Sequence, residues 1–128
     1  MSKVLKFEDL DCWKEARVLV KNIYSSLNQN KSIDHDTKSQ MRKATLSMMN
    51  NIAEGFGRYS DKEFIRFLEY SSSSAAEVKS MLYVFEDLQY LNQNHLDILH
   101  EQVDKTRKLT LGLIRYLKNK QVKVLHHL

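Results

Sequence analysis

The sequence contains no proline and only three glycines in 128 residues. Typical proteins carry about 5% proline and about 7% glycine. Because these two residues interrupt helices and form most tight turns, their scarcity favours long helices over a fold of many short strands. A chain of this length forms one domain and buries roughly two-thirds of the surface that the unfolded chain exposes. We therefore expect a single all-α domain.

Cysteine and long apolar segments are also scarce. Cys12 is the only cysteine, which excludes an internal disulfide and a metal site built from several cysteines. We expect it to act as a small apolar side chain or as a half-exposed thiol near the start of the first helix. No apolar run is long enough to span a bilayer, and no signal-peptide core is present, which predicts a soluble, cytoplasmic protein without a membrane partner.

The net charge of +4 is unevenly distributed. Residues 59–100 are acidic overall, whereas residues 101–128 carry seven basic and two acidic groups. A basic segment of this kind can bind nucleic acid. Alternatively, an acidic helix lies beside a basic one, and cations near the end of a helix offset its dipole. The absence of a dense arginine tract favours this second interpretation.

Apolar residues recur every three or four positions in four segments, as on one face of a helix. The expected helices cover residues 10–27, 36–54, 61–91 and 95–119, followed by a flexible tail over residues 121–128. Their expected core faces are Leu10, Trp13, Ala16, Val20, Ile23 and Leu27; Met41, Ala44, Met48 and Ile52; Phe64, Phe67, Ser71, Ser74, Val78, Met81, Phe85 and Leu88; and Leu96, Leu99, Val103, Thr106, Thr110, Leu113 and Leu117. The 3.5-residue period and short connections predict an antiparallel, left-handed, up-down-up-down four-helix bundle.

The segment from residue 51 to residue 60 is expected to join the second and third helices. Gly55 and Gly57 suit a helix end because glycine accepts a positive φ at low cost. Ser60 is expected to cap the third helix, with Glu63 completing a capping box. Asn94 is the expected cap of the fourth helix.

Four consecutive serines, residues 71–74, continue the heptads of the third helix. We therefore expect small interior residues here rather than a linker. Counting back from the last turn places Ser74 level with Thr110, where the two hydroxyls could pair or bond carbonyls one turn earlier. No histidine of the pattern lies near enough to activate a serine nucleophile.

Motifs for catalysis and metal binding are weak. The nearest approach to a carboxylate metal motif is Asp97-x-x-His100 with Glu101 and Asp104, which fits a solvated helix face better than a ligand set. There is no His-Glu-x-x-His motif, and the glycines of the turn are not followed by the Lys-Ser/Thr of a phosphate loop. We expect no catalytic residue, no metal, no cofactor and no small-molecule substrate. A carboxylate metal enzyme is the least favoured class.

Several ordered blocks of the sequence resemble the family of 23S rRNA intervening-sequence proteins. The blocks are Phe7-Glu8-Asp9-Leu10 with Trp13 and Ala16; Gln40-Met41-Arg42-Lys43-Ala44 with Ser47 and Asn51-Ile52-Ala53-Glu54-Gly55; and Gly57-Arg58 with Ser60, Glu63-Phe64, Phe67-Leu68, Ser74 and Glu77. The resemblance implies a soluble four-helix bundle, often a ring-shaped homopentamer, with no established catalytic residues. Some relatives are encoded within insertions in large-subunit rRNA genes. A more distant cousin of the same fold accompanies retroelement reverse transcriptases and binds nucleic acid.

The residues of this motif are expected to have a structural role first. They are Asn51, Glu54, Gly55, Gly57, Arg58, Ser60, Ser74 and Glu77. Glu54 could pair with Arg58, four residues later, or with Arg66 across the turn. A register centred on residues 58 and 59 would place Glu77 near Gln40, where it could bond that amide or pair with Arg42 or Lys43. Such charges would fix the register of two helices, although buried pairs need not add net stability.

The leading functional hypothesis is a non-enzymatic, homo-oligomeric bundle that binds RNA or another nucleic acid electrostatically. The candidate contacts are Lys105, Arg107, Lys108, Arg115, Lys118, Lys120 and Lys123, with a second cluster of Lys38, Arg42 and Lys43. The alternative is a protein–protein adaptor with no nucleic-acid role. Self-assembly, with a pentamer favoured by the resemblance, is expected because a monomer would expose part of a set of apolar side chains outside the main stripes. This set is Phe56, Tyr59, Ile65, Leu82, Val84 and Tyr90.

Overall fold

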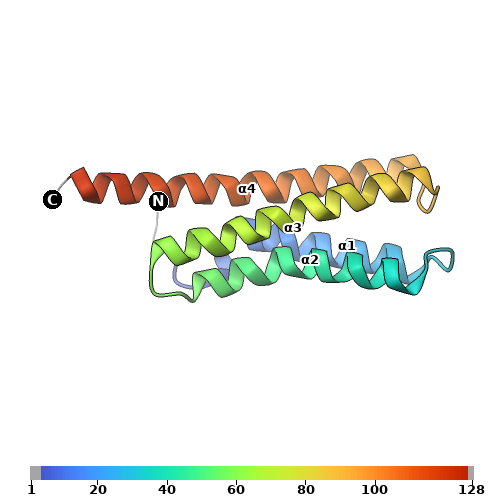
Figure 1. The fold of residues 1–128 in the computed structure, drawn as a ribbon, viewed down its shortest axis with the longest axis horizontal. Helices are drawn as coiled ribbons and strands as arrows, with labels where there is room; N and C mark the ends of the chain where they lie inside the picture. The colour runs from blue at the N-terminus through green and yellow to red at the C-terminus, as the bar shows by residue number, and fades with distance from the viewer. Residues whose placement is uncertain (1–3, 127–128) are drawn as a thin grey trace.

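The structure, a computed structural model, describes the backbone of residues 4–126 and the side chains of residues 4–120. A short 3-10 helix, η1 (Phe7–Asp9), precedes four α-helices, which are α1 (Asp11–Asn28), α2 (His35–Phe56), α3 (Asp61–Asp87) and α4 (Gln93–His126). Residues 4–126 contain no β-strand. The predicted all-α fold with four helices is confirmed (Figure 1). No described helix is both long and apolar enough to cross a membrane.

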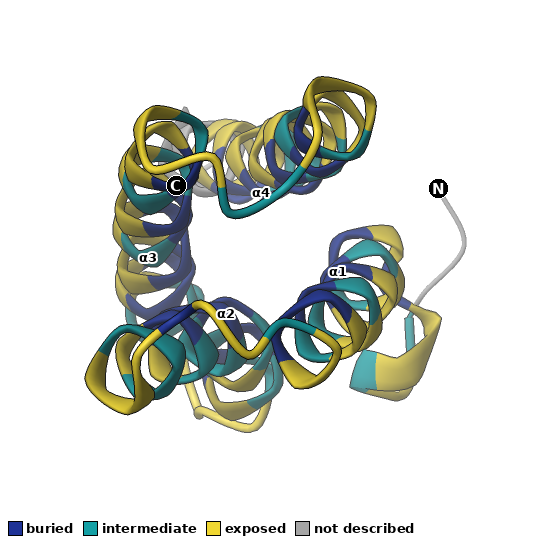
Figure 2. Ribbon diagram, turned by 90° about the vertical axis from the view of Figure 1, so that its right-hand side faces the viewer, coloured by how far each residue is buried: buried dark blue, intermediate teal, exposed yellow. Residues whose placement is uncertain are grey.

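The four helices form a closed square. Helix α1 contacts α2, α2 contacts α3, α3 contacts α4, and α4 contacts α1. Figure 2, which looks along the helices, shows the buried residues turned toward the space that the helices share. Side-chain contacts show that α2 and α3 run in opposite directions, because Ser47 meets Ser74 whereas Arg58 meets Phe67. Because the helices follow one another around the square, the α2–α3 side lies opposite the α1–α4 side. The left-handed supercoil stays a prediction.

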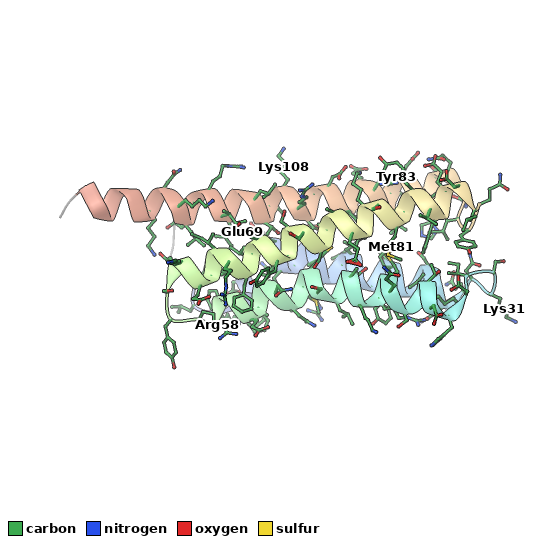
Figure 3. The ribbon with its side chains drawn as sticks, in the orientation of Figure 1. Lys31, Arg58, Glu69, Met81, Tyr83 and Lys108 are labelled. Carbon is green, nitrogen blue, oxygen red and sulfur yellow. The ribbon has the colours of Figure 1, made fainter. Side chains whose placement is uncertain are left out.

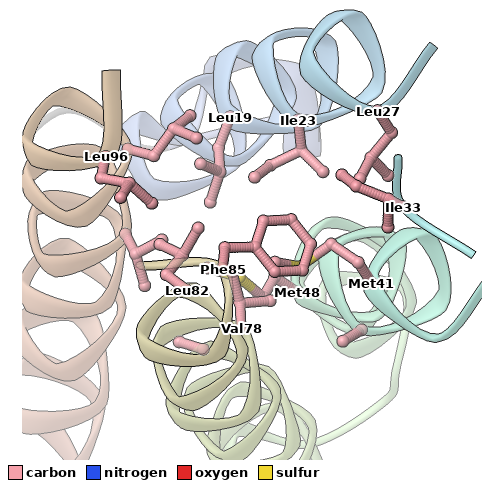
Figure 4. Packing of buried hydrophobic residues seen from close by; sticks show 14 residues of the cluster. Leu19, Ile23, Leu27, Ile33, Met41, Met48, Val78, Leu82, Phe85 and Leu96 are labelled. Carbon is pink, nitrogen blue, oxygen red and sulfur yellow. The ribbon is translucent and has the colours of Figure 1, made fainter. Parts of the chain in front are cut away.

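The main core cluster lies in the half of the bundle nearest the α1–α2 and α3–α4 connections (Figure 4). Leu19, Met48, Leu82 and Phe85 are among its fully buried side chains and come from α1, α2 and α3. Burying a leucine or phenylalanine side chain contributes about 1.5–3 kcal/mol, so this cluster is a main source of stability. The predicted core face of α2 is buried along its whole length.

The predicted core face of α3 is confirmed in part, because Phe67, Ser71, Val78 and Phe85 are buried. Ile65 and Leu82 were expected outside the core stripe but are buried, whereas Leu88 was expected inside it and is exposed. The buried residues of α3 are Ile65, Phe67, Leu68, Ser71, Ser72, Ala75, Val78, Leu82 and Phe85. Because α3 packs against both α2 and α4, its apolar stripe is two rows wide, and a single 3.5-residue row traces only one of them. The buried face of α1 also differs in part from the predicted one. Leu19 is fully buried, whereas Trp13 and Val20 are only partly buried.

Helix α3 ends at Asp87 rather than at residue 91. Gln89 adopts a φ of 57°, the one positive φ among the described non-glycine residues. The amide of Tyr90 donates to the carbonyl of Phe85 at 2.9 Å, and the amide of Gln89 donates to the carbonyl of Glu86 at 3.1 Å. The Phe85 and Tyr90 rings also pack edge to face, with their centroids 5.5 Å apart. These bonds and this contact define a Schellman motif, which ends the helix although glutamine stands where glycine is usual.

Helix α4 begins earlier and ends later than predicted. The cap is Asn92, whose side-chain oxygen accepts from the amide of His95 at 2.8 Å, and not Asn94. At the other end the helix continues to His126, so residues 121–126 are helical where a flexible tail was expected. No glycine or proline follows Gly112, and lysine, glutamine and leucine all favour a helix, so nothing stops it at residue 119. Residues 127 and 128, the rest of that expected tail, lie outside the described residues.

The turn between α2 and α3 uses glycine differently from the prediction. Gly57 ends α2 with a φ of −80°, and none of the glycines has a positive φ. Gly55 lies inside α2, where an added Cβ would be 2.6 Å from the Cβ of Phe67. Ser60 caps α3 as predicted, accepting from the amide of Glu63 at 3.2 Å. The Glu63 carboxylate pairs with Nε of Arg66 at 3.1 Å instead of completing the capping box.

Candidate functional site

Helix α4, from Lys105 onward, carries the main group of cations predicted to bind nucleic acid. All of its members with described side chains are exposed, namely Lys105, Arg107, Lys108, Arg115, Lys118 and Lys120. The predicted contact Lys123 lies outside the described side chains. Figure 3 shows Lys108 pointing away from the bundle. The structure therefore places these cations along one helix, from Arg107 level with Ser72 in the middle of α3 to Lys120 beside Asp61 at the α2–α3 turn.

Three of these cations already have partners within the subunit. Nζ of Lys105 lies 3.1 Å from the Glu15 carboxylate, and Nζ of Lys120 lies 3.3 Å from the Asp61 carboxylate. Nε of Arg107 donates to the Ser72 hydroxyl at 3.1 Å. Lys108, Arg115 and Lys118 make no such bond to any described residue, and these three can take a ligand phosphate without losing a protein contact.

The second predicted cluster does not join the first. Arg42 donates to the Asn28 side chain at 3.0 Å, and its guanidinium lies 5.6 Å from the ring centroid of Tyr24, so it is held against α1. Lys38 is half-buried and Lys43 is exposed on the same helix. Because α2 and α4 are diagonal in the square and do not contact each other, the two clusters belong to different surfaces of one subunit.

Several of the residues that carry the family resemblance lie where α2 and α3 pack together. The hydroxyls of Ser47 and Ser74 lie 2.8 Å apart, and the Asn51 amide donates to the Ser47 hydroxyl at 2.9 Å. Ser74 therefore pairs with Ser47 of α2 and not with Thr110, because it lies on the α2 side of α3. The alternative prediction, a bond to a carbonyl one turn earlier, is confirmed for Thr110, whose hydroxyl donates to the Thr106 carbonyl.

Glu54 and Glu77 are exposed side chains and not buried structural charges. Glu54 pairs with Arg58 at 2.8 Å as predicted, and the two side chains are 55% and 44% exposed. Glu77 makes no bond to Gln40, Arg42 or Lys43 within the described part of the chain. The predicted register was centred too early, because α2 extends to Phe56 and the turn follows it. This face of the molecule is polar and accessible, which suits contact with a partner.

Arginine and aromatic side chains pack together near the turn that joins α2 to α3. The guanidinium of Arg58 lies 4.5 Å from the ring centroid of Phe67, and that of Arg66 lies 5.9 Å from the centroid of Tyr70. The Phe67 and Tyr70 rings pack edge to face at 5.6 Å. Cation–π contacts of this kind contribute about 0.5–1 kcal/mol each at exposed sites. They hold Tyr70 in place while leaving it 47% exposed.

One serine–histidine pair was not foreseen from the sequence. The Ser26 hydroxyl lies 2.8 Å from Nε2 of His95, and it also lies 2.8 Å from the Asn22 carbonyl. Because the carbonyl can only accept, the Ser26 proton points to it, and the His95 ring must donate its own proton to Ser26. A general base needs the opposite direction, so this pair connects α1 to α4 and is not a nucleophile with its base.

His100 belongs to a second unforeseen cluster, between α3 and α4. Nζ of Lys79 lies 3.2 Å from Nδ1 of His100 and 2.9 Å from the Asp104 carboxylate. The ring of Tyr83 lies over His100, with the centroids 4.7 Å apart. Burial, followed by the charge of Lys79, lowers the pKa of His100. The lysine ammonium thus occupies the position between His100 and Asp104, and no group of three metal-ligating side chains occurs among the described residues.

Cys12 acts as a small buried side chain, one of the two predicted alternatives. It is 3% exposed and packs in the second core cluster beside Leu117 and Ile114. Burial raises the pKa of its thiol to about 11, so the thiolate needed for nucleophilic chemistry is scarce at neutral pH.

Comparison with known families identifies the relationship. A family described as 23S rRNA-intervening sequence protein matches residues 8–112. The chain belongs to this family. The match includes all of α2 and α3 and ends at Gly112. Arg115, Lys118 and Lys120 therefore lie beyond it. The resemblance stated from the sequence is confirmed.

Solved structures support the same fold. A crystal structure from Bacteroides thetaiotaomicron, described as a protein with unknown function from the S23 ribosomal protein family, superposes with a TM-score of 0.74. The superposition covers 80% of this chain and 97% of that one, at 18% sequence identity. At this identity the likeness shows a shared fold and carries no function. No protein with a curated description matches the chain.

Proposed function

We propose that this member of the 23S rRNA-intervening sequence family is a non-enzymatic, self-associating helical bundle that binds RNA through α4. The observation that carries the proposal is the group of exposed cations on α4 from Lys105 to Lys120, of which Lys108, Arg115 and Lys118 bond to no described residue. The family's link to an rRNA intervening sequence makes RNA the first nucleic acid to test. An up-down-up-down, left-handed bundle is the scaffold assumed here.

Binding would depend on charge and not on base sequence. Lysine and arginine side chains on a helix surface neutralise phosphates and release condensed counterions, which gives affinity without reading bases. With three to six such contacts, the affinity should fall by about 0.7–0.9 decades per contact for each decade of salt. Self-association would add to this, because several copies of α4 could contact one RNA and raise the overall affinity by avidity.

Charge reversal tests the proposal. The variant Lys108→Glu/Arg115→Glu/Lys118→Glu should weaken binding to fluorescent RNA at about 50 mM salt, where phosphate contacts are strong. The matched control is Lys14→Glu/Arg17→Glu/Lys21→Glu, which removes the same charge from exposed positions of α1. No binding of the parent protein to structured RNA, single-stranded RNA or duplex DNA would end the proposal. Equal loss in both triple variants would mean that net charge, and not α4, is responsible.

A protein adaptor is the second candidate, and one observation favours it. On the α2–α3 side of the bundle, Tyr70 and Val84 are 47% and 46% exposed, and the side chains of Glu54 and Glu77 are exposed as well. Exposed aromatic and aliphatic side chains with a polar border are common at protein interfaces. An adaptor would show no RNA affinity at low salt, and its binding to a protein partner would be lost on Tyr70→Ala.

A further inference from the structure

Gly112 lies within α4, far from either end of the helix. Glycine at such a position costs about 1 kcal/mol relative to alanine. Its φ is not positive, and an added Cβ would meet, among the described atoms, one guanidinium nitrogen of Arg115 at 3.8 Å. Gly55, in contrast, is required by the close approach of Phe67. No contact within the described subunit requires glycine at position 112.

Gly112 belongs to a heptad stripe on the outer side of α4. The stripe also contains Lys105 and Ile98, each seven residues from the next, so all three share one face of the helix. Lys105 pairs with Glu15 of α1, which shows that the stripe borders α1. Ile98 is 50% exposed. We call Ile98, Lys105 and Gly112 the α4 stripe; it lies on the α1–α4 side of the bundle.

A second stripe with the same spacing lies on the opposite side. Tyr70, Glu77 and Val84 of α3 are seven residues apart, and all three are exposed. The contact of Ser74 with Ser47 shows that this part of α3 borders α2. We call Tyr70, Glu77 and Val84 the α3 stripe; it lies on the α2–α3 side.

The two stripes occupy the same levels along the bundle. Lys79 of α3 contacts Asp104 of α4, and Ser72 contacts Arg107, which fixes the antiparallel alignment of these helices. Glu77 is consequently level with Lys105, to within about one residue or 1.5 Å of rise. Stepping one heptad in each direction places Tyr70 level with Gly112 and Val84 level with Ile98.

We propose that the α3 stripe of one subunit packs against the α4 stripe of a second copy lying parallel to it. Each level then joins matching chemistry: the Tyr70 ring fills the space above Gly112, Glu77 meets Lys105, and Val84 meets Ile98. The reversed orientation would set Tyr70 against Ile98 and leave the smaller Val84 over Gly112. Because the two surfaces differ, the contact is heterologous, and its repetition gives a ring if the rotation closes.

The inference rests on the self-association part of the proposed function and not on RNA binding. Association is measured without nucleic acid, so its failure is distinguishable from a failure to bind RNA. The triple variant of Lys108, Arg115 and Lys118 should lose RNA and keep its mass. Variants of the two stripes should change the mass whatever the protein binds.

Charge exchange is the first test. Light scattering at micromolar concentration should give the parent a mass several times the 15.1 kDa of one chain. Glu77→Lys and Lys105→Glu should each weaken association at least about tenfold, because like charges then face each other. The double variant Glu77→Lys/Lys105→Glu should recover most of the loss. Lys108→Glu, which reverses another exposed charge outside the α4 stripe, should leave the mass unchanged.

Filling the space at Gly112 is the second test. Gly112→Leu should keep or raise the melting temperature at concentrations where the protein is dissociated, since leucine favours the helix and meets little within the subunit. The same variant should lose association at least about tenfold, whereas Lys108→Leu should not. A parent protein with the mass of a monomer overturns the inference. So does association that survives Gly112→Leu and both reversals, or a double variant as dissociated as the single ones.

Discussion

Gly55 sets the distance between α2 and α3. An added Cβ would lie 2.6 Å from the Phe67 Cβ and 3.0 Å from Cδ1 of Phe64, and the Phe67 Cβ is attached directly to the backbone of α3, so it moves only if the backbone moves. We expect Gly55→Ala to lower the free energy of unfolding by about 1–3 kcal/mol, although alanine is the better helix former. Urea denaturation measures this. Gly57→Ala is the control, because its Cβ would meet the Glu54 carbonyl at an ordinary 3.6 Å. Equal effects of the two changes would contradict the packing explanation.

Glu54 was predicted from the sequence to have a structural role. Its carboxylate pairs with Arg58, yet both side chains are about half exposed, and solvent screens their attraction. We expect Glu54→Ala to change the free energy of unfolding by less than about 1 kcal/mol. A loss above about 2 kcal/mol in thermal or urea unfolding would mean that the carboxylate is bonded more strongly than this geometry allows.

At the level of elements, the end of α3 carries a residue that strains its motif. Gln89 holds a φ of 57°, a region that glycine enters without the clash that a Cβ causes. We expect Gln89→Gly to raise the free energy of unfolding by about 0.5–1 kcal/mol. Gln89→Ala, which keeps the Cβ and loses only the amide, is the control and should not raise it. The midpoints of urea unfolding distinguish the two.

The sequence predicted the elements better than their faces. Breaker scarcity and apolar spacing located the four helices, and Ser60 marked the start of α3. The end of α3 escaped prediction because its Schellman motif has glutamine in place of glycine. The core face of α3 was predicted only in part, because two neighbouring helices bury two rows of its residues and one 3.5-residue row follows only one of them.

The candidate surfaces were predicted unevenly for a similar reason. The α4 cations were found because they are adjacent in sequence. The contacts of Ser26 with His95 and of Lys79 with His100 join residues that are distant in the sequence and follow no local pattern. Which cations remain unpaired also depends on such contacts, as with Lys105 and Glu15. Composition and residue spacing predict neither these long-range contacts nor which cations stay unpaired.

For the whole molecule, the packing of α3 on α4 predicts how stability depends on pH. His100 has a pKa below its usual 6.5 in the folded protein because of burial and Lys79, although Asp104, Glu86 and Asp97 act in the opposite direction. The folded state therefore binds fewer protons than the unfolded state. The stability that depends on neutral His100 is complete above about pH 6.5 and is lost as the pH falls through the folded pKa.

We expect the free energy of unfolding to decrease between about pH 7 and pH 5, and to decrease less in His100→Gln. Urea denaturation at a series of pH values tests this. Asp34 has a lowered pKa because it accepts from the Thr37 side chain and amide, and its contribution is lost only in the more acidic range below its usual 3.8. The two groups therefore act in separate pH windows. Identical curves for the parent and His100→Gln between pH 7 and pH 5 would exclude His100 as the cause.

Assembly through the two stripes would assign different roles to the remaining sides of the bundle. The sides left free are α1–α2, which holds Arg42, and α3–α4, which holds Arg107. The two groups of cations would then lie on opposite walls of the assembly. One long RNA would contact one wall, so reversing Arg42 should not weaken a complex that depends on α4.

Cys12 provides a reporter of motion that requires no mutation. Its thiol is buried where α1 meets α4, beside Thr110, and burial raises its pKa to about 11, so the thiol stays protonated and unreactive while it is buried. An alkylating reagent can modify it only when α1 separates from the bundle, so the labelling rate, divided by that of the unfolded chain, measures the population of this opened form. Following that rate as subunits are diluted would show whether neighbouring copies restrain α1, which borders the α4 stripe.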